Sequence, residues 1–161
     1  MDPLPPAMNP PPAAVSASPF AGRALRILYA DDLPELRELM SESLSAAGHS
    51  IETAADGSEA LDRLKQAYSG FDLLITDHHM PGINGLELVR RARLLPYAVK
   101  IIVLSSSLTG TAPEDYDRLG VDAIVAKPVS PLAFRSVIEQ LFAAEQPGET
   151  PGRAGRSAAR G

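Results

Sequence analysis

Short apolar runs alternate with segments of helical period along the middle of this chain, and this alternation restricts its fold more than any other feature. Each run has the usual length of a buried strand. The strands are expected at 24–30, 50–54, 72–76, 99–104 and 122–126. Apolar residues between and after the runs recur at spacings of three and four, which is typical of amphipathic helices. The helices are expected at 34–47, 60–68, 86–92, 111–119 and 134–142.

The order of these segments predicts the fold class. Strands that are apolar on both faces and alternate with helices indicate a parallel sheet that is covered on both sides. Right-handed crossovers then give a doubly wound, three-layer α/β/α domain with a five-stranded parallel sheet. In such a sheet, ligands bind outside the carboxyl ends of the strands.

Proline marks the ends of the expected domain. Residues 1–22 hold seven of the fifteen prolines and are dominated by Pro, Ala and Ser, so we expect a disordered tail there. Residues 145–161 are rich in Gly, Pro and Arg and contain little to bury, so a second disordered tail is expected. The folded domain is therefore predicted to cover 23–144, with too few residues after it for an output domain.

Composition excludes several function classes. A net charge of −5 argues against direct DNA binding by a basic surface. The absence of cysteine excludes a disulfide scaffold, a thiolate zinc site and a cysteine nucleophile. No apolar run approaches the ~18 residues of a membrane span, and the chain start lacks the pattern of a secretory signal. We therefore expect a cytoplasmic protein without membrane insertion.

Polar residues follow four of the five expected strands. Asp31 and Asp32 come after the first strand, Asp77 after the third, Ser105 after the fourth and Lys127 after the fifth. Three neighbouring carboxylates repel one another and need a cation to stay ionised together. An all-oxygen set without His or Cys ligands favours Mg²⁺ over zinc. A carboxylate nucleophile, Mg²⁺, a lysine and a hydroxyl are the parts that phosphoryl transfer to an aspartate requires.

Each of these residues also has a simpler interpretation. Asp32 could cap the first helix, and Asp77 could be an ordinary turn residue. The coincidence of four strand ends that carry the four parts of one reaction favours the chemical interpretation. No phosphate-binding loop, dinucleotide fingerprint or nucleophile elbow competes with it.

Four segments resemble the receiver domains of two-component response regulators. They read ILYADDLPELREL at 27–39, LLITDHHMPGINGLEL at 73–88, KIIVLSSS at 100–107 and AIVAKPV at 123–129. The resemblance covers about 25–142, and the combination of D-x-x-M-P-G-x-x-G with K-P fifty residues after its Asp is highly specific. It implies the flavodoxin-like (βα)5 receiver fold.

The resemblance also implies roles for the acidic residues. Asp77 would be the phosphoacceptor and would take its phosphoryl group from a phosphohistidine on a sensor histidine kinase or a histidine phosphotransfer protein. Asp32 and Asp77 would bind Mg²⁺ directly, Asp31 would act through water, and the backbone carbonyl of His79 would supply another ligand. Such a domain is a signalling module rather than an enzyme, although it assists its own phosphorylation and dephosphorylation.

The resemblance also implies roles for Lys127 and Ser105, and the sequence departs from the family pattern at Ile124. Lys127 would reach the phosphoryl oxygens, and its bond to Pro128 would be cis. Ser105 stands where Thr is commoner in the family and would bind a phosphoryl oxygen on activation. Ile124 stands where the family often has a Tyr or Phe that turns inward, so the aromatic half of the usual switch is missing.

Other positions are expected to be less specific. The fourth helix is short, with Tyr116 and Leu119 as its only large apolar residues, which puts the usual output face in question. His78 and His79 are interpreted as solvent-facing loop residues, with a mild influence of the His79 side chain on dephosphorylation left open, and His49 as an ordinary loop residue.

The leading hypothesis is a stand-alone response regulator that signals through phosphorylation-dependent binding to an unidentified downstream protein. A phosphoryl shuttle or sink, and a non-phosphorylated pseudo-receiver that acts as a binding module, are alternatives. A phosphatase with an aspartate nucleophile is disfavoured, because it needs a D-x-D pair at the first strand and a cap insertion, and this chain has neither.

Overall fold

A computed structural model describes residues 23–67, 70–107, 110 and 112–143 of the chain. Both predicted tails, and the residues Tyr68, Thr111 and Ala144 at the predicted element and domain ends, lie outside the described residues. The described chain forms one parallel sheet with the strand order β2-β1-β3-β4-β5. The strands are β1 (Arg26–Ala30), β2 (Ser50–Ala54), β3 (Leu73–Asp77), β4 (Lys100–Ser105) and β5 (Ala123–Ala126).

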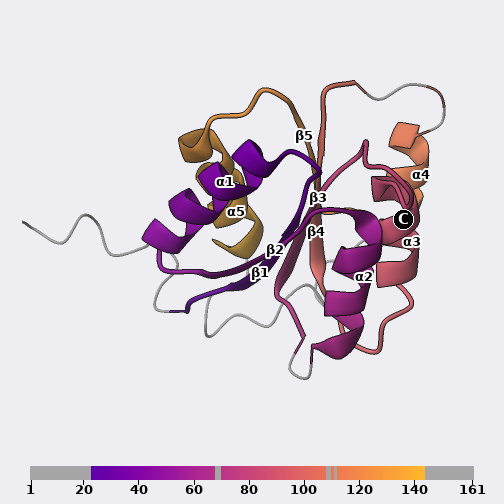
Figure 1. Cartoon of the computed structure of the whole chain (residues 1–161), viewed down its shortest axis with the longest axis horizontal. Helices are drawn as coiled ribbons and strands as arrows, with labels where there is room; N and C mark the ends of the chain where they lie inside the picture. Colours follow the sequence, from indigo (N-terminus) through magenta and orange to yellow (C-terminus); the bar gives the residue numbers. More distant parts are fainter. Residues whose placement is uncertain (1–22, 68–69, 108–109, 111, 144–161) are drawn as a thin grey trace, which may run out of the picture.

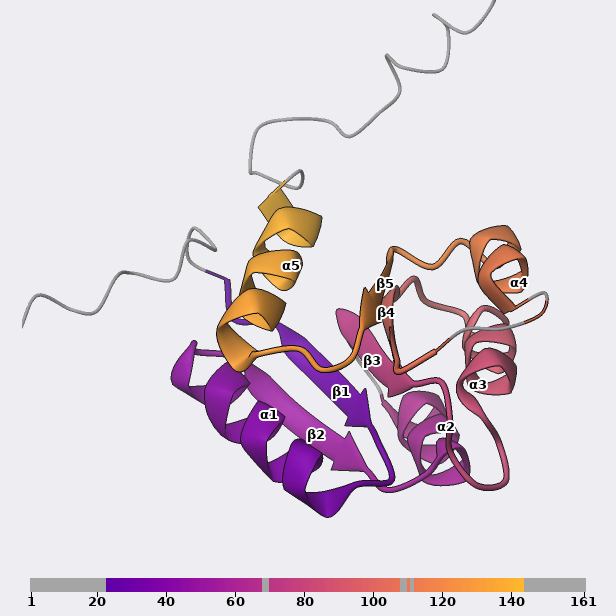
Figure 2. The ribbon, with the colours of Figure 1, turned by 90° about the horizontal axis from the view of Figure 1, so that it is seen from above.

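Helices cover both faces of this sheet, as Figures 1 and 2 show. One face packs against α1 and α5, in a core that includes Tyr29, Met40 and Phe134. The other face packs against α2 and α3 in a core that also takes Tyr116 from α4. The helices are α1 (Pro34–Ala46), α2 (Gly57–Gln66), α3 (Gly85–Ala92), α4 (Ala112–Arg118) and α5 (Pro131–Ala143). The predicted doubly wound, three-layer fold is confirmed.

Local sequence explains where the helices begin. Pro34 occupies the first turn of α1, where the missing backbone donor has no cost. Asp56 caps α2 by accepting a hydrogen bond from the backbone N–H of Glu59, and Asn84 caps α3 in the same way. The N-cap of α1 is Leu33, without a side-chain hydrogen bond, so the interpretation of Asp32 as a helix cap is wrong.

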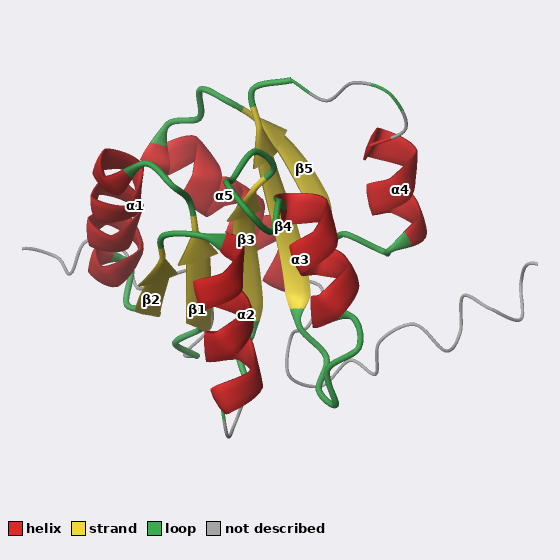
Figure 3. Ribbon diagram, turned by 45° about the vertical axis from the view of Figure 1, so that its right-hand side comes forward, coloured by secondary structure: helices red, strands yellow, loops and turns green. Residues whose placement is uncertain are grey.

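The fifth strand differs from the prediction. Its residues alternate between half-buried and exposed, and Ile124 keeps 42% of its surface exposed. The short helix α4 packs against α3, and Figure 3 shows it to one side of β5. The expectation that every strand is covered on both faces is therefore wrong for β5, which lies at one of the two edges of the sheet.

His49 is also not the ordinary loop residue that the sequence indicated. Its side chain is buried between α1 and β2, and its Nδ1 accepts a hydrogen bond of 3.1 Å from the backbone N–H of Leu25. Burial lowers the pKa of the His49 imidazole, and the nearby Arg135 guanidinium lowers it further. A neutral imidazole is the form that can accept this hydrogen bond.

In the part of the chain that the structure describes, no helix is long and apolar enough to cross a membrane.

Candidate functional site at the carboxyl edge of the sheet

Strand register brings the predicted site residues to one edge. Ala30 of β1 pairs with Thr76 of β3, so the next residue in each strand direction is an aspartate, Asp31 or Asp77. Ser105 of β4 pairs with Ala126 of β5, directly before Lys127. The five residues that the sequence singled out therefore converge, since the carboxyl ends of parallel strands meet at the same edge.

Three carboxylates form the centre of the site. Asp31, Asp32 and Asp77 each offer an oxygen, and these three oxygens lie within 4.8 Å of one another. Asp31 and Asp77 are buried, whereas Asp32 is exposed. The Lys127 ammonium lies 3.2 Å from Oδ2 of Asp31 and 3.3 Å from Oδ2 of Asp77, and so bridges the two buried acids.

Asp31 is held in place by several groups. Its Oδ1 accepts a hydrogen bond of 2.9 Å from the backbone N–H of Leu33. Its Oδ2 accepts one of 2.8 Å from the Tyr29 hydroxyl, in addition to the contact with Lys127. Sequence reasoning missed Tyr29, although a tyrosine two residues before the acid, in a strand expected to be buried, needs a partner for its hydroxyl.

The surroundings of Asp77 disfavour the ionised form of its carboxyl group and so raise its pKa. Burial raises its pKa above the ordinary value, the Lys127 ammonium opposes this effect, and the neighbouring Asp31 carboxylate raises the pKa further. A buried carboxylate beside a second one gains from a divalent cation, and an all-oxygen cluster is the ligand set that Mg²⁺ prefers. The residues present therefore fit Mg²⁺.

Ser105 lies at the same edge and is buried, but its hydroxyl donates to the backbone carbonyl of Ser107 at 2.9 Å. A role toward a group on Asp77 therefore requires this local hydrogen bond to break. The peptide bond between Lys127 and Pro128 is cis, as the family resemblance implied.

The two histidines after Asp77 differ from each other. The His79 side chain is exposed, as predicted. His78 is half-buried, and its Nδ1 forms a hydrogen bond of 2.6 Å with the Tyr116 hydroxyl of α4. The interpretation of His78 as a solvent-facing loop residue is therefore wrong, and Tyr116, expected only as an apolar residue of α4, also has a polar contact.

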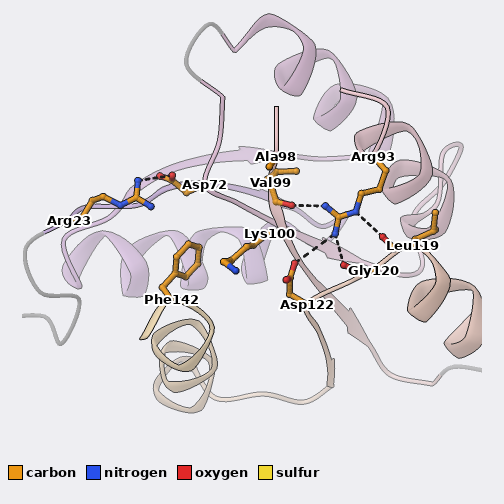
Figure 4. A pocket seen from close by; sticks show the side chains of 10 residues that line it. All are labelled: Arg23, Asp72, Arg93, Ala98, Val99, Lys100, Leu119, Gly120, Asp122 and Phe142. Atoms are coloured by element: carbon orange, nitrogen blue, oxygen red, sulfur yellow. Dashed lines mark hydrogen bonds and ion pairs between the residues drawn. The ribbon is translucent and has the colours of Figure 1, made fainter. Parts of the chain in front are cut away.

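Two cavities lie outside the acidic cluster. One of about 260 Å³ is lined mainly by apolar side chains, including Leu36 and Met40 of α1, and borders Lys127. The other, of about 500 Å³, lies at the opposite edge of the sheet and contains the ion pairs of Arg23 with Asp72 and of Arg93 with Asp122. Figure 4 shows this second cavity.

A three-layer α/β/α domain with buried acids and a lysine at the carboxyl edge of its sheet has the architecture of an aspartate phosphoacceptor module. The family model of the response regulator receiver domain matches residues 27–139. This protein belongs to that family, which consists of signalling domains of two-component systems.

Comparisons with individual proteins agree with this assignment. The chain is 39% identical over 110 residues to the gliding motility regulatory protein of Myxococcus xanthus. The matched segment makes up 68% of this chain and 13% of that protein. It is 32% identical over 111 residues to the sensory/regulatory protein RpfC of Xanthomonas campestris, covering 66% of this chain and 15% of the relative. The chain thus spans only a small part of these curated relatives.

Two solved structures resemble the domain over nearly their whole length. The chemotaxis response regulator CheY4 of Vibrio cholerae superimposes with a TM-score of 0.68 at 28% identity, over 74% of this chain and 99% of that chain. A CheY-like receiver domain protein of Methanospirillum hungatei gives a TM-score of 0.69 at 27% identity, over 76% and 98% of the two chains.

Proposed function

We propose that Asp77 accepts a phosphoryl group from a phosphohistidine of a sensor histidine kinase or a histidine phosphotransfer protein, in a Mg²⁺-dependent reaction. The observation that carries this proposal is the position of Asp77. It is a buried carboxylate at the carboxyl edge of the sheet, 3.3 Å from the Lys127 ammonium and clustered with two further acids.

In the proposed reaction, a carboxylate oxygen of Asp77 forms a bond to phosphorus while the bond between phosphorus and the donor's imidazole nitrogen breaks. The electron pair of that bond returns to the imidazole, and Asp77 becomes an acyl phosphate. Lys127, already within 3.3 Å of Asp77, would follow the new phosphoryl oxygens. Ser105 would exchange the Ser107 carbonyl for a phosphoryl oxygen.

Mg²⁺ would be held by Asp32 and Asp77 directly, by Asp31 through water, and by the backbone carbonyl of His79. When bound, the cation offsets the negative charge of the carboxylates and the incoming phosphoryl oxygens. The contacts of Asp31 support its indirect role, because Tyr29, Leu33 and Lys127 already occupy positions around its two oxygens. Asp32 is exposed and accessible to an incoming ion.

The apolar cavity beside Lys127 supports a protein as the donor. A small-molecule donor needs access only to Asp77 and Lys127, whereas a protein must also rest on neighbouring surface. Leu36 and Val129 line this cavity next to the reacting groups, are partly exposed, and offer apolar contacts to a partner that presents its phosphohistidine here.

We further propose that phosphorylation is transmitted by a change in affinity for a downstream protein, in the cytoplasm. A shuttle that passes the phosphoryl group on uses the same acceptor and differs only in returning it to a phosphotransfer protein. A binding module that is never phosphorylated is the remaining alternative, and the close contact of Lys127 with both buried acids argues against it.

The test is the intact mass of the protein after incubation with acetyl phosphate, with and without Mg²⁺. We expect wild type to gain one phosphoryl group only when Mg²⁺ is present, and Asp77→Asn to gain none. Asp62→Asn, which changes an exposed acid of α2, is the matched control and should behave as wild type. An adduct that persists in Asp77→Asn would contradict the proposal.

Acetyl phosphate does not phosphorylate every receiver, so purified candidate histidine kinases charged with ATP form the second arm of this test. If neither donor modifies wild type, the unphosphorylated binding module becomes the better account. Return of the phosphoryl group from isolated phosphorylated protein to a phosphotransfer protein would identify the shuttle.

A further inference from the structure

Tyr116 links the helix α4 to the chain segment that carries Asp77. Its side chain is fully buried, and its hydroxyl lies 2.6 Å from Nδ1 of His78, the residue directly after Asp77. The two rings also meet edge to face, with centroids 5.5 Å apart. One side chain of α4 therefore contacts the segment whose preceding residue is the proposed phosphoacceptor.

The backbone around His78 is fixed by its neighbours. The His78 N–H donates to the Leu104 carbonyl of β4 at 2.9 Å, and the His78 carbonyl accepts from the Gly85 N–H of α3 at 3.0 Å. Gly85 has no room for a side chain, because a Cβ there would collide with the Asp77 carbonyl oxygen and come within 3.0 Å of the Tyr116 hydroxyl. Asp77, the start of α3 and Tyr116 are thus in direct contact, so a shift of one displaces the others.

The charge states of the two side chains fit a neutral hydrogen bond. Burial lowers the pKa of the His78 imidazole and raises the pKa of the Tyr116 phenol, so burial favours the uncharged form of each.

The fifth strand offers no comparable contact. The residue of β5 on the same face of the sheet is Ile124, which has no hydroxyl or ring and is 42% exposed. Its strand partner Val103 lies in the core that contains Tyr116, which places both side chains on the α4 side of the sheet. On this face, the buried aromatic residue near Asp77 comes from α4 rather than from β5.

We propose that the hydrogen bond between Tyr116 and His78 couples the state of Asp77 to the position of α4, in place of an aromatic side chain at position 124. This inference rests on the proposed phosphorylation of Asp77. A phosphoryl group on Asp77 changes the packing around the 77–78 peptide, and the Tyr116 side chain transmits that change to α4. Tyr116 is a positioning residue in this scheme and does not touch the reacting atoms.

The test compares amide hydrogen exchange in α4 before and after phosphorylation, in wild type and in Tyr116→Phe, with exchange in α2 as the internal reference. Intact mass on the same samples gives the phosphoryl occupancy. Tyr116→Phe keeps the buried ring and removes only the hydroxyl. Tyr97→Phe is the matched control, because the Tyr97 hydroxyl also donates to a fixed partner, the Leu64 carbonyl at 2.8 Å, but lies away from Asp77.

We expect phosphorylation to change α4 exchange at least about fivefold in wild type and in Tyr97→Phe, in the range of ordinary coupling between sites. Tyr116→Phe should reach the same phosphoryl occupancy with little change in α4. His78→Leu, which removes the same hydrogen bond from the other side, should reproduce this loss, and the double variant should add nothing further.

The outcomes separate this inference from the proposed function. Full phosphorylation of Tyr116→Phe with a wild-type response in α4 would overturn the coupling and leave the phosphoacceptor role intact. Phosphorylation of wild type without any response in α4 would do the same. Failure of wild type to take a phosphoryl group from any donor would overturn both.

Discussion

Tyr29 is a single residue that determines how the acidic site is held. Its hydroxyl, fully buried beneath the sheet edge, donates to Oδ2 of Asp31 at 2.8 Å. Burial and the nearby Asp31 carboxylate raise the pKa of the Tyr29 phenol, so it remains a donor over the working pH range. The Asp31 carboxyl is completely buried, and its three contacts with Tyr29, Lys127 and the Leu33 N–H offset the cost of removing it from water.

Removing this one hydroxyl should be costly. We expect Tyr29→Phe to lower the free energy of unfolding by about 1.5–3 kcal/mol in Mg²⁺-free buffer, since a hydrogen bond to a buried charged group is lost. Tyr97→Phe removes a hydroxyl that donates to a neutral carbonyl, and should cost only about 0.5–1.5 kcal/mol. Urea denaturation measures both, and equal losses in the two variants would contradict a special role of the Asp31 charge.

At the scale of the secondary-structure elements, hydrogen bonds at the start of α2 make the stability of the domain depend on pH. The first turn of α2 is closed by a reciprocal pair, in which Asp56 accepts from the Glu59 N–H and Glu59 accepts from the Ala55 N–H, each at 2.8 Å. The hydrogen bond from Ala55, with help from Arg63, lowers the pKa of the Glu59 carboxyl below its ordinary value. The carboxylate therefore stabilises the fold above the ordinary pKa, and this contribution is lost as the pH falls through the depressed value.

Glu59→Gln tests this sign. At neutral pH the variant should be less stable than wild type, and the difference should shrink as the pH falls below the ordinary value of 4.5. Glu42→Gln, at an exposed position of α1, is the control and should show no such trend. Thermal melts at several pH values measure the difference, and a gap that widened toward acid would show that another group controls it.

Arg93, at the end of α3, joins three elements at the edge of the sheet opposite the acids. Its guanidinium donates to the carbonyls of Leu119, Val99 and Gly120 at 2.6–2.9 Å and lies 3.8 Å from Asp122 (Figure 4). These contacts hold the segment between α4 and β5 against the start of β4. The planar fork of arginine suits several carbonyls at once, which a lysine ammonium does not.

We expect Arg93→Met to lower the free energy of unfolding by about 1–3 kcal/mol and to speed hydrogen exchange in residues 119–122. Arg93→Lys should recover only part of the stability, because it keeps the charge but loses the fork. Urea denaturation and exchange measured by mass spectrometry give both quantities. Full recovery by lysine would mean that charge, rather than geometry, holds this segment.

At the scale of the whole molecule, the sequence predicted the meeting of distant residues better than their individual contacts. Asp31, Asp77 and Lys127 could be placed together because parallel strands end at one edge, whatever the side chains do there. Hydrophobic periodicity located every strand to within two residues for the same general reason. These inferences depend on topology, which the pattern of apolar residues specifies.

Contacts between side chains of different elements were not predictable in this way. The pairing of His78 with Tyr116 joins residues 38 positions apart, and periodicity marks Tyr116 only as buried. The exposure of Ile124 likewise depends on where α4 comes to lie, which its seven residues do not specify. The roles of His78, Tyr116 and Ile124 thus depend on the orientation of a neighbouring helix, which the sequence does not specify. His49 was misjudged for a different reason, because its hydrogen-bond partner is the backbone N–H of Leu25, 24 positions earlier in the chain.

The global stability of the domain should depend on the charge at its sheet edge. Burial raises the pKa of Asp77, so in Mg²⁺-free buffer its ionisation weakens the fold as the pH rises from the ordinary value of 3.8 through the raised value. Asp77→Asn removes this cost. At neutral pH without Mg²⁺ the variant should therefore be more stable than wild type, and the gap should close as the pH falls below 3.8.

Mg²⁺ should reverse that order. An ion that binds only the folded state at a concentration of 100 times its dissociation constant stabilises it by about 2.7 kcal/mol. Wild type should gain this amount, whereas Asp77→Asn, which lacks one of the proposed ligands, should gain much less, and Asp62→Asn should match wild type. Urea denaturation with and without Mg²⁺ measures these gains. Equal gains in wild type and Asp77→Asn would place the ion elsewhere, because linkage allows a ligand to stabilise the fold only through the groups that bind it.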